Sequence, residues 1–158
     1  MAGTFEYRQA REITGAFERH HVRFLFIGKS GAIILGYPDT TQDADLFVEK
    51  TAENGRAIVA ALDELSFRLS DQDRREVETG KDFVQLRDGP FDLDLVFAPD
   101  GIETFAEAAR RAVVVDGLPV CHPDDIIRSK EATGRVKDRE SLPRLKAFRD
   151  WWAARQKT

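Results

Sequence analysis

The chain has 158 residues, of which 42% are hydrophobic and 33% are charged, and its formal net charge is −4 at pH 7. These values predict one globular domain spanning residues 1–158, and they argue against a protein that coats nucleic acid through bulk positive charge. A single cysteine, Cys121, allows no internal disulfide. No apolar run reaches the roughly 18 residues that a membrane span requires. We therefore expect a cytoplasmic protein without a membrane partner.

Apolar periodicity predicts helices and strands along the whole chain. A spacing of three to four residues indicates amphipathic helices, and alternation in steps of two indicates strands. The expected elements, in chain order, are helix 5–19, strand 22–27, helix 30–35, strand 43–48, helix 52–67, strands 83–86 and 91–97 joined by a tight turn, helix 101–111, strand 113–115, a helix from residue 123, and helix 141–155. Together they predict an α/β or α+β domain with a small mixed sheet flanked by helices.

Two of these strands carry acidic residues at alternate positions: Asp43 with Asp45, and Asp92 with Asp94. Alternate residues of a strand point to the same side, so the like charges of each pair repel and need a compensating cation. Mg²⁺ fits, because it prefers carboxylate oxygens and keeps room for water and phosphates. We expect Asp43, Asp45 and Asp94 to converge on one cleft, close enough to share an ion, with Asp92 farther out. The alternative is that these acids only face solvent.

A glycine-containing segment, Gly28-Lys29-Ser30-Gly31, lies between the first predicted strand and the next helix. Free backbone N–H groups at such a position form an anion site, so Gly28, Lys29 and Ser30 are candidates for holding a triphosphate. A true P-loop is excluded, because it requires a glycine where Arg23 stands. The alternative is that the two glycines only permit a tight turn.

The order of these features resembles the DNA polymerase β-like nucleotidyltransferase superfamily. It is most similar to the small prokaryotic members, which are the minimal nucleotidyltransferases and the abortive-infection type toxins. The matching features are the Gly28-Lys29-Ser30 segment, the Thr41-Gln42-Asp43-Ala44-Asp45 run and Asp94 on a later strand. The resemblance implies the nucleotidyltransferase fold, with a catalytic core at about 22–97 and a helical C-terminal segment at about 120–155.

The resemblance also implies roles for individual residues. Asp43, Asp45 and Asp94 would hold Mg²⁺, with two ions allowed and Mn²⁺ able to substitute, and Asp94 is a candidate general base. Lys130 matches a phosphate-binding lysine of the toxin-like members. We expect this lysine to be exposed, so that its loss would leave folding intact.

The implied reaction is transfer of a nucleoside monophosphate from an NTP, such as ATP, to an acceptor hydroxyl on tRNA, a protein or a small molecule. A role as the toxin of a toxin–antitoxin system is also implied, with an antitoxin or helical protein as partner. Two residues depart from the pattern. Lys29 stands where the family usually has glycine or serine, and Asp39 stands where many relatives have arginine. They favour the alternative of a non-catalytic nucleotide-binding or protein-interaction module that retains the fold.

Overall fold

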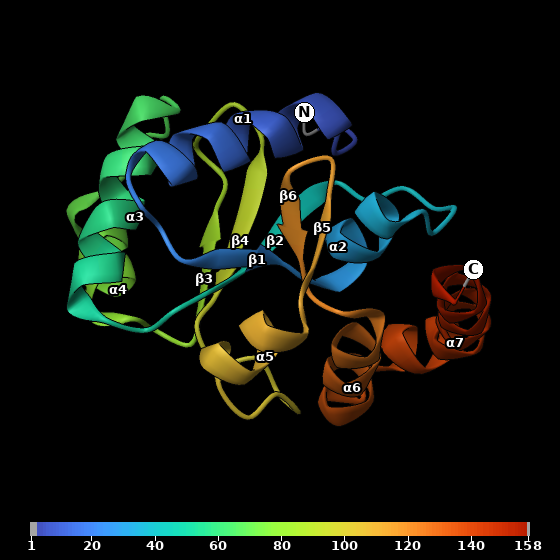
Figure 1. Ribbon diagram of the computed structural model, residues 1–158. Coiled ribbons are helices and arrows are strands. Elements are labelled where there is room, and N and C mark those ends of the chain that lie inside the picture. The colour runs from blue at the N-terminus through green and yellow to red at the C-terminus, as the bar shows by residue number, and fades with distance from the viewer. Residues whose placement is uncertain (1–2, 158) are drawn as a thin grey trace.

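A six-stranded mixed sheet forms the centre of the computed structural model, which describes residues 3–157 (Figure 1). Its strands are β1 (Phe24–Phe26), β2 (Asp43–Val48), β3 (Phe83–Leu86), β4 (Asp92–Val96), β5 (Val113–Val115) and β6 (Leu118–Val120). The strand order is β3-β4-β2-β1-β6-β5. β2 pairs in parallel with β4, and β1 with β6, whereas the other pairs are antiparallel. The predicted small mixed sheet is confirmed.

Helices cover both faces of this sheet (Figure 1). They are α1 (Tyr7–Arg19), α2 (Gly28–Leu35), α3 (Ala52–Glu64), α4 (Asp71–Thr79), α5 (Phe105–Arg111), α6 (Pro123–Thr133) and α7 (Val136–Gln156). On one face, the ring of Phe17 in α1 packs edge-on against Phe24 of β1, with centroids 5.1 Å apart. On the other face, Phe47 of β2 packs against Phe105 of α5 at 5.2 Å. The sheet is therefore the middle layer of the domain.

The apolar residues of β2 and β4 set how these two strands pair. Ala44, Leu46, Leu93 and Leu95 are fully buried, and Leu46 lies opposite Leu95. A slip of one residue would turn these side chains away from the core, so burial specifies the register strongly. The intervening acids are consequently placed on the opposite face of the sheet.

Two elements go beyond the sequence prediction, α4 and β6. α4 begins with a capping box, in which Ser70 and Asp73 exchange side-chain to backbone hydrogen bonds, and it ends at Gly80 with a φ of 76°. β6 forms a hairpin with β5, and its turn contains Asp116 with a φ of 51°. α7 also begins at Val136, earlier than the predicted start at residue 141. Within residues 3–157, no helix is long and apolar enough to cross a membrane.

Candidate functional site

The parallel pairing of β2 and β4 brings four carboxyl groups to one face of the sheet. Asp43 lies opposite Asp92, and Asp45 lies opposite Asp94. Adjacent strands are about 4.8 Å apart, so this register holds like charges close together. A stable fold at this point needs positive charge nearby.

A cavity of about 530 Å³ opens over this face. Of the four strand carboxylates, Asp43, Asp45 and Asp94 line it, whereas Asp92 does not. Basic side chains from other elements line the same cavity: Lys29, Lys130, Arg135 and Lys137. Its size lies within the range of about 300–1,000 Å³ that small-molecule sites occupy. The cavity therefore combines carboxylates with basic groups, as a site for a metal and a polyphosphate requires.

Gly28 brings the start of α2 next to the carboxylates. Gly28, Lys29 and Ser30 form the first turn of this helix rather than a loop ahead of it. The N–H groups of a first turn have no partner within the helix, so they are available to an anion. Gly28 has a φ of 65°, and a Cβ atom there would lie 2.5 Å from Oδ2 of Asp45. Glycine is required because a side chain would collide with that carboxylate.

Ser30 holds Asp45 in place. Its fully buried hydroxyl donates to the carbonyl of Ile27 at 3.1 Å and accepts from the backbone N–H of Asp45 at 2.9 Å. Ser30 is not among the residues that line the cavity, although the other two members of the turn are. The hydroxyl therefore ties α2 to β2, which leaves only the backbone N–H of Ser30 for a phosphate.

The carboxyl groups of Asp45 and Asp94 are held in an environment that disfavours their charge. Burial raises the pKa of Asp45 well above its usual value, the neighbouring Asp94 and Asp43 raise it further, and Lys130 opposes the shift. Burial also raises the pKa of Asp94, against the opposing effect of Arg87. Oδ1 of Asp94 is buried and accepts no hydrogen bond within the described chain. In their deprotonated form these carboxylates are the hard oxygen donors that a divalent cation prefers, and the cation would supply the positive charge that favours this form.

Arg87, in the turn between β3 and β4, is a neighbour of the site that the sequence prediction missed. Its Nη1 lies 2.9 Å from Oδ1 of Asp94, without the alignment of a hydrogen bond, and its Nη2 lies 3.6 Å from Oδ2 of Asp43. Its Nε lies 4.0 Å from Oδ2 of Asp92. The sequence holds a signal for this placement, because the alternation of the strand puts residues 83, 85 and 87 on the side of Asp94.

One positively charged side chain lies among the predicted metal ligands. Arg87 contacts Asp94 and Asp43 and supplies positive charge to them. Within residues 3–157, no group of three His, Cys, Asp or Glu side chains is already arranged as a metal site. Asp43, Asp45 and Asp94 line one cavity, their oxygens are donors of the type that a divalent cation prefers, and their sharing of an ion stays a prediction.

Lys130 reaches the cavity from α6. This helix begins with Pro123, and its N-cap is His122, whose Nδ1 accepts from the backbone N–H of Asp124 at 3.0 Å. The residues of α6 that line the cavity are Ile126, Ser129, Lys130 and Thr133. Their spacing defines one face of a helix, so a whole face of α6 forms a wall of the site.

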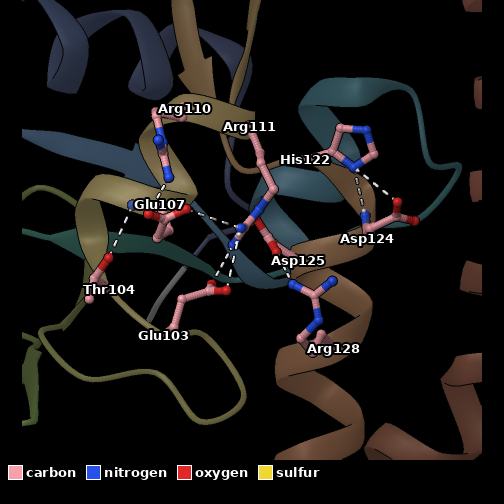
Figure 2. A network of polar contacts seen from close by, with 9 residues as sticks. All are labelled: Glu103, Thr104, Glu107, Arg110, Arg111, His122, Asp124, Asp125 and Arg128. Carbon is pink, nitrogen blue, oxygen red and sulfur yellow. Dashed lines mark hydrogen bonds and ion pairs between the residues drawn. The ribbon is translucent and has the colours of Figure 1, made fainter.

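Asp125 fixes the orientation of that face (Figure 2). Its carboxylate is fully buried, accepts a hydrogen bond from Nε of Arg111 at 2.9 Å and also pairs with Arg128. Arg111 pairs in addition with Glu103, just ahead of α5. The network therefore ties α6 to α5 and so sets which of its side chains face Asp45.

Lys130 is largely buried, which corrects the expectation of an exposed lysine. Its side chain is 16% exposed, and its Nζ lies 3.6 Å from Oδ1 of Asp138 in α7. Burial lowers the pKa of Lys130, whereas Asp138 and Asp45 oppose the change. Burial alone would raise the pKa of Asp138, but Arg135 and Lys130 bring it below its usual value. Loss of Lys130 would leave the buried Asp138 with Arg135 alone, so some loss of stability is expected.

The two residues that depart from the family pattern are partners of each other. Nζ of Lys29 lies 3.3 Å from Oδ2 of Asp39. A hydrogen bond from the backbone N–H of Thr40 lowers the pKa of Asp39, burial opposes this, and Lys29 lowers it further. Lys29 also lines the cavity, so its ammonium group is both paired and close to the candidate phosphate site.

No family model and no curated relative match the chain. Solved structures, in contrast, do match the chain. A crystal structure of a Thermotoga maritima protein, provisionally assigned as a nucleotidyltransferase, matches with a TM-score of 0.57 at 18% identity, over 90% of this chain and 92% of that one. The solution structure of the antibiotic-resistance factor ANT(2″)-Ia matches with a TM-score of 0.56 at 18% identity, over 96% and 95%. The chain has the nucleotidyltransferase fold. The predicted fold is thereby confirmed.

Proposed function

We propose that the protein is a Mg²⁺-dependent nucleotidyltransferase, which transfers a nucleoside monophosphate from an NTP to an acceptor hydroxyl. The observation that carries the proposal is the shared cavity of Asp43, Asp45, Asp94 and Lys130. The nucleotidyltransferase fold of the chain supports it independently.

Each side of the cavity has a distinct role in this reaction. Asp43, Asp45 and Asp94 would hold Mg²⁺ or Mn²⁺, which supplies charge neutralisation when bound. The N–H groups of the first turn of α2 donate to the phosphates, and Lys29 and Lys130 balance their charge. The acceptor oxygen attacks the α-phosphorus, its proton passes to Asp94, and the bond to the bridging oxygen breaks to release pyrophosphate. The result is one new phosphodiester-type bond on the acceptor.

The acceptor and any partner enter this proposal through the family resemblance alone. The acceptor would be tRNA, a protein or a small molecule, and ATP is the first NTP to test. A toxin role with an antitoxin or other helical partner, and a cytoplasmic location, belong to the same proposal.

Pyrophosphate release and acceptor labelling with each NTP test the proposed reaction. The Asp94→Asn variant keeps the size of the side chain but removes its charge, so we expect a loss of at least about 10³-fold, or about 4 kcal/mol of barrier. Asp92→Asn is the matched control, because it makes the same change on the same strand outside the cavity. It should stay within about 3-fold of wild type. Equal losses in both variants, or full activity in Asp94→Asn, would contradict the assignment.

A non-catalytic nucleotide-binding module is the second candidate. The specific observation in its favour is that Arg87 contacts two of the carboxylates proposed to hold the metal, Asp43 and Asp94. Calorimetry separates the two candidates. The module binds NTP without pyrophosphate release, and its affinity does not depend on Mg²⁺, whereas the enzyme shows both release and metal dependence.

A further inference from the structure

Arg87 is placed as a counter-ion of the carboxylate cluster rather than as an ordinary surface arginine. It lies within 4.0 Å of three carboxylates from two strands, Asp43, Asp92 and Asp94. The side chain of Asp94 is only 8% exposed, whereas that of Arg87 is 41% exposed. A buried carboxylate therefore receives its compensating charge from a side chain that reaches in from the solvent.

The contact is suited to displacement. A guanidinium does not lose its proton at ordinary pH, so it can withdraw its charge only by moving away. Its nearest contact, Nη1 to Oδ1 of Asp94, lacks hydrogen-bond alignment, and its other two carboxylate contacts are 3.6 Å and 4.0 Å long. Arg87 also lies in a turn and is partly exposed, so solvent is available to it outside the cluster.

A divalent cation and Arg87 would compete for the same oxygens. Both are attracted to Asp43 and Asp94, but the cation carries twice the charge and binds carboxylate oxygens directly. The guanidinium already contacts the oxygens that the cation would bind, with Nη1 2.9 Å from Oδ1 of Asp94 and Nη2 3.6 Å from Oδ2 of Asp43. Removal of Arg87 would leave those oxygens uncompensated and ready for the cation.

We propose that Arg87 is a resident counter-ion which a divalent cation displaces, so that Arg87 sets the metal affinity of the site. The inference rests on the metal-binding part of the proposed function. It adds that Arg87 compensates the negative charge of the carboxylates when no metal is bound. A metal ion must therefore break the ion pairs of Arg87 in order to bind.

Direct titration with Mn²⁺, followed by electron paramagnetic resonance of the free ion, tests the competition without any need for activity. The Arg87→Ala variant should bind Mn²⁺ at least about 10-fold more tightly than wild type, whereas Arg87→Lys, which keeps the charge, should stay closer to wild type. Arg74→Ala is the matched control. Arg74 is similarly exposed at 39% and pairs with Asp63 away from the cavity. It removes the same net charge and should leave Mn²⁺ affinity unchanged.

Thermal unfolding gives an independent measurement. In EDTA, Arg87→Ala should melt below wild type, because Asp94 and Asp43 lose their counter-ion. Added Mn²⁺ should stabilise the variant more than it stabilises wild type. A 10-fold gain in affinity corresponds to about 1.4 kcal/mol of additional stabilisation at saturating Mn²⁺. If Arg87→Ala does not fold in EDTA, the same comparison is made with Arg87→Lys and with Mn²⁺ present during refolding.

The outcomes separate this inference from the proposed reaction. Equal or weaker Mn²⁺ binding by Arg87→Ala, or no Mn²⁺ binding by either protein, overturns the inference. Tighter binding without nucleotide transfer by either protein supports the inference and removes the proposed reaction. Nucleotide transfer by wild type together with unchanged Mn²⁺ affinity in Arg87→Ala supports the proposed reaction and overturns the inference.

Discussion

The two faces of β2 and β4 are built from alternate residues of the same short strands, and they have opposite effects on the stability of the fold. On the face of the sheet that α1 and α3 cover, Leu46, Leu93 and Leu95 are fully buried and stabilise the domain. On the cavity face, Asp43, Asp45 and Asp94 are held together against their mutual repulsion. The comparison teaches that the apolar face determines the register, and the register then forces the carboxylates into one place.

The largest expected effect comes from the apolar face. Leu95→Ala should lower the free energy of unfolding by about 2–5 kcal/mol, because Leu95 is fully buried and the neighbouring strands cannot fill the space it leaves. Urea denaturation measures this effect. Gln85→Ala, on the exposed side of β3, is the control and should change the stability by no more than about 0.5 kcal/mol. A loss below about 1 kcal/mol for Leu95→Ala would mean that the apolar face does not fix the register.

A smaller effect is expected at the basic wall of the cavity. Lys130→Ala should raise the KM for NTP about 10-fold, or about 1.4 kcal/mol, because a partly desolvated ammonium interacts strongly with phosphate. Initial-rate kinetics measures this effect, and Lys130→Met separates the loss of charge from the loss of packing. Lys146→Ala is the matched control, since Lys146 pairs with Glu131 between the same two helices but does not line the cavity. Equal KM values for Lys130→Ala and wild type would leave Lys130 only a structural role with Asp138.

Much of the fold could be predicted from the sequence, because apolar and polar residues alternate along its strands and its helices are strongly amphipathic. The strands 43–48, 83–86 and 113–115 were predicted with the bounds that the structure has. α4 was missed because its only buried residue is Val77, which leaves no apolar stripe to detect. β6 was missed because its three residues include Pro119 and depend on pairing with β5 and β1.

The candidate site could be predicted only in part. Alternation along two strands was enough to place four acids on one face of the sheet, once the strands were assumed to be neighbours, but it does not determine that Asp94 lines the cavity and Asp92 does not. The contact of Arg87 with these acids depends on the path of a turn, and the burial of Lys130 depends on how α6 and α7 pack. Alternation along β3 indicates the side of the sheet on which Arg87 lies, but the contacts themselves follow from tertiary structure and are not specified by a local pattern.

The smallest effect, and the sharpest test of the contrast between the two faces, concerns the charge of Asp45. Burial raises the pKa of Asp45 in the folded protein well above 3.8. The folded state therefore keeps a proton that the unfolded chain has released. The stability of the metal-free protein must then fall as the pH rises from about 3.8 through the raised pKa. Asparagine cannot ionise, so Asp45→Asn should remove this loss and melt above wild type at pH 7 to 8 in EDTA.

The melting temperature of Asp45→Asn should rise by about 2–4 °C for each kcal/mol of added stability, which differential scanning calorimetry over a pH series can resolve. Asp92→Asn is the matched control, because it makes the same change outside the cavity and should not reproduce the gain. With saturating Mn²⁺ the order should reverse, since the cation stabilises wild type through the carboxylate that Asp45→Asn lacks. If Asp45→Asn melts below wild type in EDTA, Asp45 is stabilising as a charged group. The cavity face would then contribute to the fold as the apolar face does, and the contrast between them would be lost.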